Sequence, residues 1–274
     1  MDIDLNIDCK ETTKIIIDFL KTYFDNSKSK NIVIGLSGGI DSAVTAVLCK
    51  KAIGNKKLKC VFLPETTTPE DDYKDKELLI KNFDLFCETK NISFIVKQFE
   101  KLCIIKPDKY ALANIKARTR MIILFEYANM TKSIVCGTSN KSELLIGYFT
   151  KYGDGGVDLI PIGDLYKTQI YDMAKYLKIP NRIIKKPPTA GLWKDQLDEK
   201  ELNMNYKKLD IILAGLENKM EISKIANIAN VDISEINRVI KMRKQSQHKR
   251  RLALIPKIGL RTPGLDWRST VLEG

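Results

Sequence analysis

The sequence predicts an α/β fold, in which a parallel five-stranded sheet carries helices on both faces and is followed by a helical C-terminal extension. Between about residues 30 and 163, short β-branched runs alternate with longer stretches of helical spacing, which is typical of parallel sheets covered by helices. After about residue 164 the strand-like runs stop and helical patterns continue to about residue 251. Because no repeat or clear linker interrupts the 274 residues, residues 1–274 are expected to form one domain.

Five short runs rich in β-branched and other apolar residues are predicted to be the strands, the last of them with the weakest pattern. They are Asn31–Leu36, Leu58–Leu63, Ile92–Lys97, Ser133–Gly137 and Val157–Ile162. Between the strands, apolar residues recur at helical spacing, as at Ile115, Ile122 and Ile123. The helices predicted there are Ile40–Ile53, Pro69–Glu88 and Ala111–Met130.

The extension is predicted to consist of helices only, over about residues 164–251. The helices are Asp164–Leu177, Asp198–Leu216, Ile222–Ala229 and Ile233–Gln247. Asp232 followed by Glu235 is a capping-box pattern, which predicts that the last of these helices begins at Ile233.

Composition favours an ordinary globular protein, with 44% hydrophobic and 29% charged residues. The acidic N-terminus, Met1 to Asp4, lacks the basic start and apolar run of a secretory signal. No stretch approaches the roughly 20 apolar residues that span a bilayer. A cytoplasmic protein without a membrane partner is therefore expected.

Six cysteines are present, none in a C-x-x-C pair, and the single histidine, His248, has no cysteine near it. The pattern favours free thiols in a reducing compartment over a zinc site. The formal net charge is +12, which suits nucleic acid or a polyanionic small ligand. Because the lysines outside the C-terminal tail are spread singly along predicted helices, nucleic acid is not expected as a partner.

A glycine-rich string between the first strand and the first helix is the strongest functional signal. It reads Gly35, Leu36, Ser37, Gly38, Gly39, Ile40, Asp41 and Ser42. The glycines permit a tight turn whose N–H groups approach an anion, and the following helix points its positive end at the same place. The string is not a Walker A motif, because no G-x-x-x-x-G-K-[ST] occurs. Two glycines at a helix start also occur as a simple turn.

The string SGGIDS resembles the pyrophosphate loop of the ATP pyrophosphatases, and six further motifs, in order, resemble the ammonia-dependent NAD synthetase branch of that group. They are N-x-x-A-R-x-R-M at 114–121, G-T-x-N-x-x-E at 137–143, GYFTKYGDGGVD at 147–158, LYKTQ at 165–169, PTAGLW with QLDE at 188–199, and HKR at 248–250. The resemblance covers about residues 31–251. It implies a Rossmann-like fold of the adenine nucleotide α hydrolase type.

The resemblance implies a set of binding residues. ATP would lie over Gly35–Ser42 and contact Thr138, Lys167 and Thr189. Magnesium would be held by Asp41 and Glu143, whose carboxylates are the hard oxygen ligands that Mg²⁺ prefers. Deamido-NAD would be held by Arg118, Lys151, Asp158, His248 and Lys249. Asp41, Asp158 and Lys167 are the catalytic residues that the resemblance implies.

The activity implied by the resemblance is that of a ligase, which amidates deamido-NAD with ammonia and ATP to give NAD, AMP and pyrophosphate. Since only about 30 residues precede the first predicted strand, ammonia rather than glutamine is the expected nitrogen source. The family also implies a homodimer. Two polar, proline-bearing segments, Pro64–Tyr73 and Pro187–Leu202, are expected to act as lids that exclude water from the adenylated intermediate.

The sequence is also compatible with three alternative functions. A tRNA-modifying ATP pyrophosphatase would explain the net charge of +12. Such an enzyme typically carries a C-x-x-C pair or an added RNA-binding domain, and neither is recognised in this sequence. A GMP-synthetase-like amidotransferase shares SGGIDS but not the Lys151–Asp158 run. A non-catalytic nucleotide-binding module would not need Asp41 and Glu143. The basic cluster at 241–251 could likewise be an RNA patch, a solvated face or a wall of the dinucleotide site.

Overall fold

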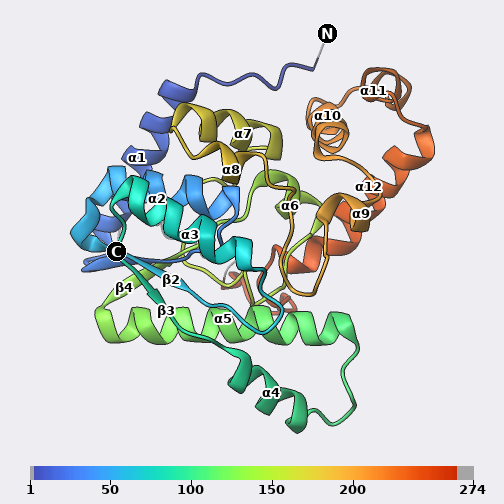
Figure 1. Cartoon of the computed structure of the whole chain (residues 1–274). Helices are drawn as coiled ribbons and strands as arrows, with labels where there is room; N and C mark the ends of the chain where they lie inside the picture. The colour runs from blue at the N-terminus through green and yellow to red at the C-terminus, as the bar shows by residue number, and fades with distance from the viewer. Residues whose placement is uncertain (1–2, 264–274) are drawn as a thin grey trace.

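A computed structural model describes residues 3–263, whose centre is a four-stranded parallel sheet of order β3-β2-β1-β4 (Figure 1). The strands are β1 (Asn31–Gly35), β2 (Leu58–Phe62), β3 (Cys87–Thr89) and β4 (Ser133–Cys136). Ile34 of β1 pairs with Cys60 of β2 on one side and with Cys136 of β4 on the other. Because β2 and β4 flank β1 on opposite sides, the strand order reverses between β1 and β4, which is where α/β sheets bind ligands.

Helices cover both faces of this sheet, as predicted (Figure 1). Alternate side chains of a strand point to opposite faces, so Ile32 and Ile34 pack in one buried cluster and Val33 in another. The first face is covered by α1 (Cys9–Asn26), α2 (Ile40–Ile53) and α7 (Lys167–Tyr176), and the second by α5 (Lys109–Thr131). Strands β1 and β4 are therefore buried on both sides, which explains their apolar runs Ile32–Ile34 and Ile134–Cys136.

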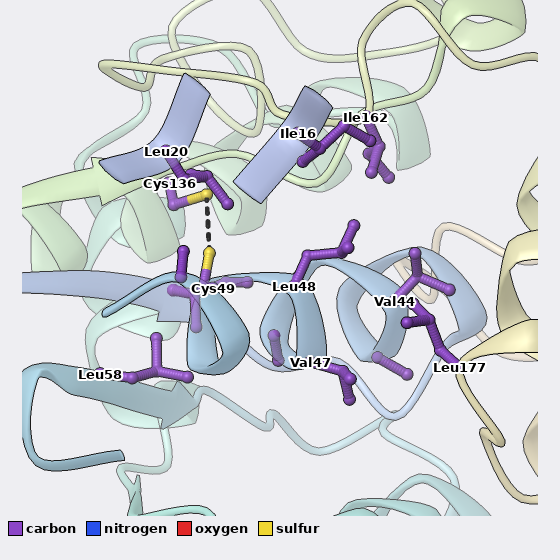
Figure 2. Packing of buried hydrophobic residues seen from close by; sticks show 14 of the residues in the cluster. Ile16, Leu20, Val44, Val47, Leu48, Cys49, Leu58, Cys136, Ile162 and Leu177 are labelled. Carbon is purple, nitrogen blue, oxygen red and sulfur yellow. Dashed lines mark hydrogen bonds between the residues drawn. The ribbon is translucent and has the colours of Figure 1, made fainter. Parts of the chain in front are cut away.

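Helix α2 lies deepest in the molecule, between α1 and the sheet (Figure 2). Leu48 and Cys49 are fully buried, and the Cys49 sulfur lies 3.7 Å from that of Cys136 in β4. Leu20 of α1 packs in the same cluster. Burial of α2 from all sides fixes the position of its N-terminus, and with it the glycine-rich turn that precedes it.

The predicted strand Ile92–Lys97 is wrong, because this segment belongs to helix α4 (Ser93–Leu102). Its two most buried apolar residues, Ile92 and Val96, are four positions apart, which is a helical spacing. The third strand is β3, which the sequence analysis placed at the end of the helix Pro69–Glu88. That helix, α3, runs from Glu70 to Phe83 and ends at Asp84 in a left-handed conformation. A short apolar run does not distinguish a strand from a buried helix turn.

The predicted fifth strand, Val157–Ile162, is reduced to a single parallel bridge between Cys136 and Leu159. The sheet of the described chain therefore has four strands rather than five. Helix α1 was not predicted. No helix among residues 3–263 is both long and apolar enough to cross a membrane.

The C-terminal part is helical, as predicted, and its helices pack around a separate buried cluster that includes Leu209, Ile212 and Ile236. Its elements are α9 (Asp198–Leu202), α10 (Tyr206–Glu217), α11 (Ile222–Ala229), α12 (Ile233–Gln245) and the 3-10 turn Ser246–Lys249, whereas the short helix α8 (Asn181–Ile184) packs against the sheet cluster through Ile183. Together with α6 (Lys141–Ile146) and the 3-10 turn Asn55–Lys57, these complete the described elements.

Two details of this helical part were predicted differently. The helix predicted over Asp198–Leu216 is broken, because Asn203 adopts a left-handed conformation and Asn205 caps a new helix. The capping box of Asp232 and Glu235 is confirmed. The single domain over residues 1–274 stays a prediction, and its residues 1–2 and 264–274 lie outside the described range.

Candidate active site

A pocket of about 490 Å³ opens at the carboxyl ends of β1 and β4, within the roughly 300–1,000 Å³ typical of small-molecule sites. Its walls come from the turn after β1, the turn after β4, helix α5 and the segments around residues 64–72 and 186–201. The pocket therefore lies at the reversal of strand order. Distant parts of the chain meet there because parallel strands end at one edge of the sheet.

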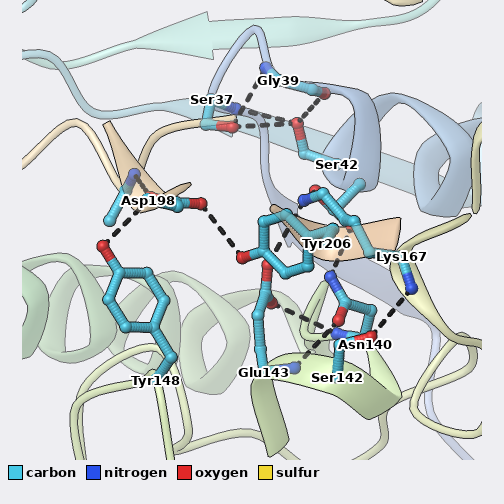
Figure 3. A network of polar contacts seen from close by, with 12 residues as sticks. Ser37, Gly39, Ser42, Asn140, Ser142, Glu143, Tyr148, Lys167, Asp198 and Tyr206 are labelled. Carbon is cyan, nitrogen blue, oxygen red and sulfur yellow. Dashed lines mark hydrogen bonds and ion pairs between the residues drawn. The ribbon is translucent and has the colours of Figure 1, made fainter. Parts of the chain in front are cut away.

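The floor of the pocket is the glycine-rich turn before α2. Gly38 has a φ of +80°, and a Cβ there would lie 2.8 Å from the carbonyl oxygen of Asp72, so only glycine fits. The hydroxyl of Ser42 accepts from the N–H of Ser37 at 3.2 Å and donates to the carbonyl of Gly39 at 3.0 Å (Figure 3). The helix N-terminus that follows has no side-chain cap, which leaves its N–H groups available to an anion.

Three charged side chains meet beside this turn, two of which, Glu143 and Lys167, are labelled in Figure 3. The ammonium of Lys167, at the start of α7, lies 2.5 Å from an oxygen of Asp41 and 3.3 Å from an oxygen of Glu143. Asp41 comes from the first turn of α2 and Glu143 from the first turn of α6. Two carboxylates and one ammonium from three helix starts thus share one point on the pocket wall, all three lining it.

Neighbouring polar groups hold this cluster in place. Asn140 donates to Asp41 at 3.0 Å and forms a capping box with Glu143. The hydroxyl of Ser142 accepts from the backbone N–H of Lys167 at 2.9 Å and donates to the buried carboxylate of Asp210 at 2.5 Å. Because each partner is itself hydrogen-bonded, the charged groups have fixed positions before any ligand arrives.

Burial and mutual charge shift the pKa values in the cluster. Burial raises the pKa of Glu143 above its ordinary value, since Lys167 offsets only part of the desolvation, and Asp41 adds to the rise. Burial alone would lower the pKa of Lys167, but Asp41 and Glu143 outweigh it and raise that pKa, so the ammonium stays charged. A fixed positive charge at this place suits a polyanionic ligand.

A second group of contacts joins the segment after α8 to the pocket wall. The buried carboxylate of Asp198 accepts from the hydroxyls of Tyr148 at 3.1 Å and Tyr206 at 3.2 Å, and from the N–H of Ala190 at 3.0 Å. Figure 3 shows Tyr148 and Tyr206 reaching Asp198 from opposite sides. Burial raises the pKa of Asp198 and outweighs Lys167 and the two tyrosine hydrogen bonds, all of which lower that pKa.

The structure brings most of the residues predicted for ATP to this pocket. All of Gly35–Ser42 except Gly38 line it, as do Thr138, Lys167 and Thr189. Of the residues predicted for deamido-NAD, Lys249 lines it, and the others lie outside its walls: Arg118, Lys151, Asp158 and His248. The roles of all these residues stay predictions.

The residues outside the walls have other contacts. The guanidinium of Arg118 donates to the backbone carbonyl of Lys151 at 3.3 Å. Asp158 accepts from the N–H of Val135 in β4 at 2.7 Å. His248 is exposed on the turn that follows α12.

The basic cluster near residue 250 contributes to structure as well. Lys249 donates to the carbonyls of Gly147 at 2.7 Å and Phe149 at 2.8 Å, which anchors the segment that enters the pocket. Arg250 donates to the carbonyls of Leu144 and Leu145 at the end of α6. A cation at a helix C-terminus is favourable, so this cluster is not merely a solvated face.

Several pocket residues were missed by the sequence analysis. Tyr148, Asp198 and Lys186 line the pocket, and Lys186 donates to Asp72 at 2.5 Å beside the glycine-rich turn. The motifs that contain Tyr148 and Asp198 were recognised, but nothing in their spacing predicted that these side chains meet. Lys186 lies between motifs and carried no signal of its own.

The comparisons with known proteins agree with this site. The sequence model of the family described as NAD synthase matches residues 12–253. An NH(3)-dependent NAD(+) synthetase of Saccharolobus solfataricus is 43% identical over 270 residues, which cover 96% of this chain and 95% of the relative.

Two solved structures, each 32% identical to this chain, resemble it over its length. An NMN synthetase from Francisella tularensis superimposes with a TM-score of 0.82, and an NH3-dependent NAD synthetase from Campylobacter jejuni, in complex with the nitrate ion, with a TM-score of 0.78. In both comparisons, 92% of this chain and 100% of the other are covered. These comparisons therefore show both the fold and the family of this chain.

Proposed function

The chain belongs to the NAD synthase family, and on that premise we propose that its pocket performs the ATP-dependent amidation of deamido-NAD with ammonia to give NAD. The enzyme is a ligase, and its other products are AMP and pyrophosphate. The observation that carries this proposal is the cluster of Asp41, Lys167 and Glu143, which lines the pocket beside the glycine-rich turn. The relatives do not favour a tRNA-modifying pyrophosphatase.

ATP is proposed to bind with its phosphates at the turn Gly35–Ser42. The uncapped N-terminus of α2 and the Lys167 ammonium both present positive charge to this part of the pocket. Thr138 and Thr189 are proposed as further contacts, since both line the pocket. We therefore propose that the α-phosphate lies beside this turn, where the substrate carboxylate can reach it.

Magnesium fits the residues beside this turn. One oxygen of Asp41 and one of Glu143 contact the same ammonium, so the two carboxylates converge on one point, and both offer hard oxygen ligands. Within residues 3–263 no group of three or more His, Cys, Asp or Glu side chains converges as a metal site. Asp41 and Glu143 would hold Mg²⁺ together with the phosphates, and the ion would neutralise charge on the leaving pyrophosphate.

The chemistry needs a leaving group because a carboxylate is a poor electrophile. The nicotinate carboxylate attacks the α-phosphate of ATP, and pyrophosphate leaves toward the glycine-rich turn. Ammonia then attacks the adenylated carbonyl, and AMP leaves. The protein positions the reactants and stabilises charge through Lys167 and the backbone N–H groups. Asp158 is proposed to place the ammonium or take its proton.

Deamido-NAD is proposed to contact Arg118, Lys151, Asp158, His248 and Lys249. Support comes from two placements. First, Lys249 lines the pocket. Second, the side chain of Arg118 contacts the backbone of Lys151, so Arg118 and Lys151 are neighbours. A lysine beside a neighbouring arginine suits the diphosphate of a dinucleotide.

Product analysis tests the activity directly. Purified protein with ATP, magnesium, deamido-NAD and ammonium should form NAD, AMP and pyrophosphate in equal amounts. Because one similar structure is that of an NMN synthetase, nicotinic acid mononucleotide should be offered in parallel, and we expect it to react more slowly. Formation of ADP and phosphate would contradict the adenylation chemistry. Faster reaction of the mononucleotide would contradict the assignment of deamido-NAD as the substrate.

We also propose that the enzyme is a homodimer. Large apolar side chains are exposed on α4 and on the segment that follows it, including Phe94, Leu102, Ile104 and Ile105. Such a concentration of exposed apolar residues is typical of an interface. Sedimentation at several concentrations should report a dimer. Phe94→Asp with Ile105→Asp should yield a monomer, whereas Tyr176→Asp, on the exposed face of α7, should not.

A cytoplasmic location is proposed from the thiols. All six cysteines are free, and three of them, Cys49, Cys60 and Cys136, are buried. Burial raises the pKa of each of Cys60 and Cys136, which keeps these thiols protonated and unreactive. Such thiols are compatible with a reducing compartment.

A further inference from the structure

Helix α5 carries a buried lysine that the proposed mechanism does not use. The side chain of Lys116 is 6% exposed, and its ammonium lies 2.6 Å from a carboxylate oxygen of Glu65, whose side chain is 3% exposed. The same ammonium donates to the backbone carbonyl of Leu192 at 2.7 Å and to the hydroxyl of Thr67 at 3.4 Å. The three N–H groups of the lysine thus have three acceptors.

These acceptors belong to two segments that are far apart in the sequence. Glu65 and Thr67 are in the turn after β2, which we call the first mouth segment (residues 64–73). Leu192 is in the second mouth segment (residues 187–202). Both segments line the pocket, through residues such as Pro64 and Thr68 in the first and Thr189 and Leu192 in the second. Lys116 and Glu65 are not among the lining residues, so they act on the pocket only through these segments.

Each mouth segment depends on contacts with α5. In the first, the carboxylate of Glu65 accepts from Thr66 at 3.0 Å and from Thr67 as well as from Lys116. In the second, the ring of Trp193 packs edge-on against Tyr110 at 5.7 Å between centroids. Of these contacts, only that of Lys116 joins both segments to each other.

Because Lys116 is charged and buried, its contacts with both mouth segments have to be kept. A buried ammonium is unfavourable unless its partners are in place. If either segment moves away, the ammonium loses a protein acceptor that only solvent can replace. Opening of one segment is therefore coupled to opening of the other through Lys116, in addition to the ion pair between Asp72 in the first segment and Lys186, which directly precedes the second.

We propose that Lys116 is a positioning residue, which holds the two mouth segments together over the pocket so that water stays away from the adenylated carboxylate. This inference rests on the proposed function. If the mouth opens, water competes with ammonia. The water oxygen bonds to the acyl carbon, the bond from that carbon to the oxygen of AMP breaks, and deamido-NAD carboxylate and AMP are released with protons to solvent. ATP is then spent without forming NAD.

The ratio of AMP to NAD measures this loss, and partial unfolding does not change it. A variant with fewer folded molecules makes less of both products in equal proportion, whereas an open mouth makes AMP in excess. We expect wild-type protein to form AMP and NAD in a ratio of about one, and Lys116→Met to raise that ratio about tenfold or more at limiting ammonium, a scale typical of misplaced reactants.

Two companion variants separate position from charge. Lys116→Met with Glu65→Gln removes the unpaired carboxylate, so the fold is kept while the junction to Leu192 is still lost, and the excess of AMP should persist. The matched control is Lys76→Met, which removes another buried lysine that pairs with a glutamate, Glu77, at 2.5 Å but contacts neither mouth segment in a hydrogen bond. That control should keep a ratio of about one.

Hydrogen exchange provides an independent measurement. Amides of residues 64–73 and 187–202 should exchange faster in the double variant than in wild type, and both segments should change together. An AMP to NAD ratio of one in both Lys116 variants, or an equal excess of AMP in Lys76→Met, would overturn the proposal. Wild-type protein that forms no NAD at all would instead refute the proposed function on which the inference rests.

Discussion

Two buried lysines beside the same pocket, Lys167 and Lys116, differ in what surrounds their charge. Lys167 meets Asp41 and Glu143, and all three side chains line the pocket. Lys116 meets Glu65 and the carbonyl of Leu192, and neither Lys116 nor Glu65 lines it. The first lysine can exchange its carboxylate partners for a ligand's phosphates, whereas the second is satisfied entirely by protein. Burial of a lysine does not by itself indicate a ligand site. What indicates one is that the charged partners of the lysine also line the pocket.

The two lysines also differ in the kind of structural element that carries their partners. The three members of the Lys167 cluster all lie at helix starts, and their side chains meet at one point of the pocket wall. The partners of Lys116 are in loops rather than at helix starts. Lys167 therefore belongs to the part of the pocket that is built from helix starts, and Lys116 to the loops at its mouth.

The largest effect is expected when the ligand-facing lysine is removed. Lys167→Met should lower kcat for NAD formation by about 100- to 1,000-fold, the scale of one preorganised group lost from a transition state. The product ratio should stay at about one, in contrast to Lys116→Met. Steady-state kinetics with quantification of AMP and NAD tests both points. Lys175→Met, an exposed lysine on the same helix, is the control; a similar loss there would remove the special status of Lys167.

The carboxylate partners of Lys167 should matter nearly as much. Asp41→Asn and Glu143→Gln should each lower turnover on the order of 100-fold, because each removes an oxygen ligand for magnesium near the phosphates. The magnesium concentration at half-maximal rate should also rise. Titration of activity with magnesium measures this shift, with Asp172→Asn on the surface of α7 as the control. Near-normal turnover of both variants at saturating magnesium would show that the assigned roles are wrong.

A third lysine, Lys249, lies between the two cases, because it lines the pocket but donates to two backbone carbonyls. His248→Ala with Lys249→Ala should weaken deamido-NAD binding about tenfold, the scale of one charged hydrogen bond, and ATP binding less. Titrations at two ionic strengths should show a modest salt dependence. Unchanged deamido-NAD affinity, together with steeply salt-sensitive RNA binding, would instead make the 241–251 cluster an RNA patch.

The smallest effect concerns stability and pH. Burial alone would raise the pKa of Glu65, but hydrogen bonds from Lys116 and Thr67 outweigh it, so the pKa lies below its ordinary 4.5. Its contribution to stability is therefore present above pH 4.5 and is lost as the pH falls below that value toward the folded-state pKa. Glu65→Gln should thus lower the free energy of unfolding at pH 7 and have less effect at acidic pH. Urea unfolding at several pH values measures this, and a difference that is independent of pH would contradict it.

The amino-acid sequence was sufficient to predict the α/β class, three of the strands, most of the helices and the glycine-rich turn. These features depend on local physics. Periods of apolar residues select helix or strand, Asp232 and Glu235 cap a helix, and Gly38 adopts a backbone that other residues avoid. Where the local signal was ambiguous, the prediction failed, as at Ile92–Lys97, whose apolar residues fit a helix and a strand equally well.

The sequence also indicated which residues to examine, since Asp41, Glu143 and Lys167 were predicted together and do meet. The contacts that join Glu65 to Leu192 through Lys116, and those that Tyr148 and Tyr206 share on Asp198, became visible only in the folded chain. These contacts span 51 and 76 residues for Lys116 and 50 for Tyr148 with Asp198. No local period encodes such a contact, because it depends on how the sheet, α5 and the two mouth segments pack around one pocket.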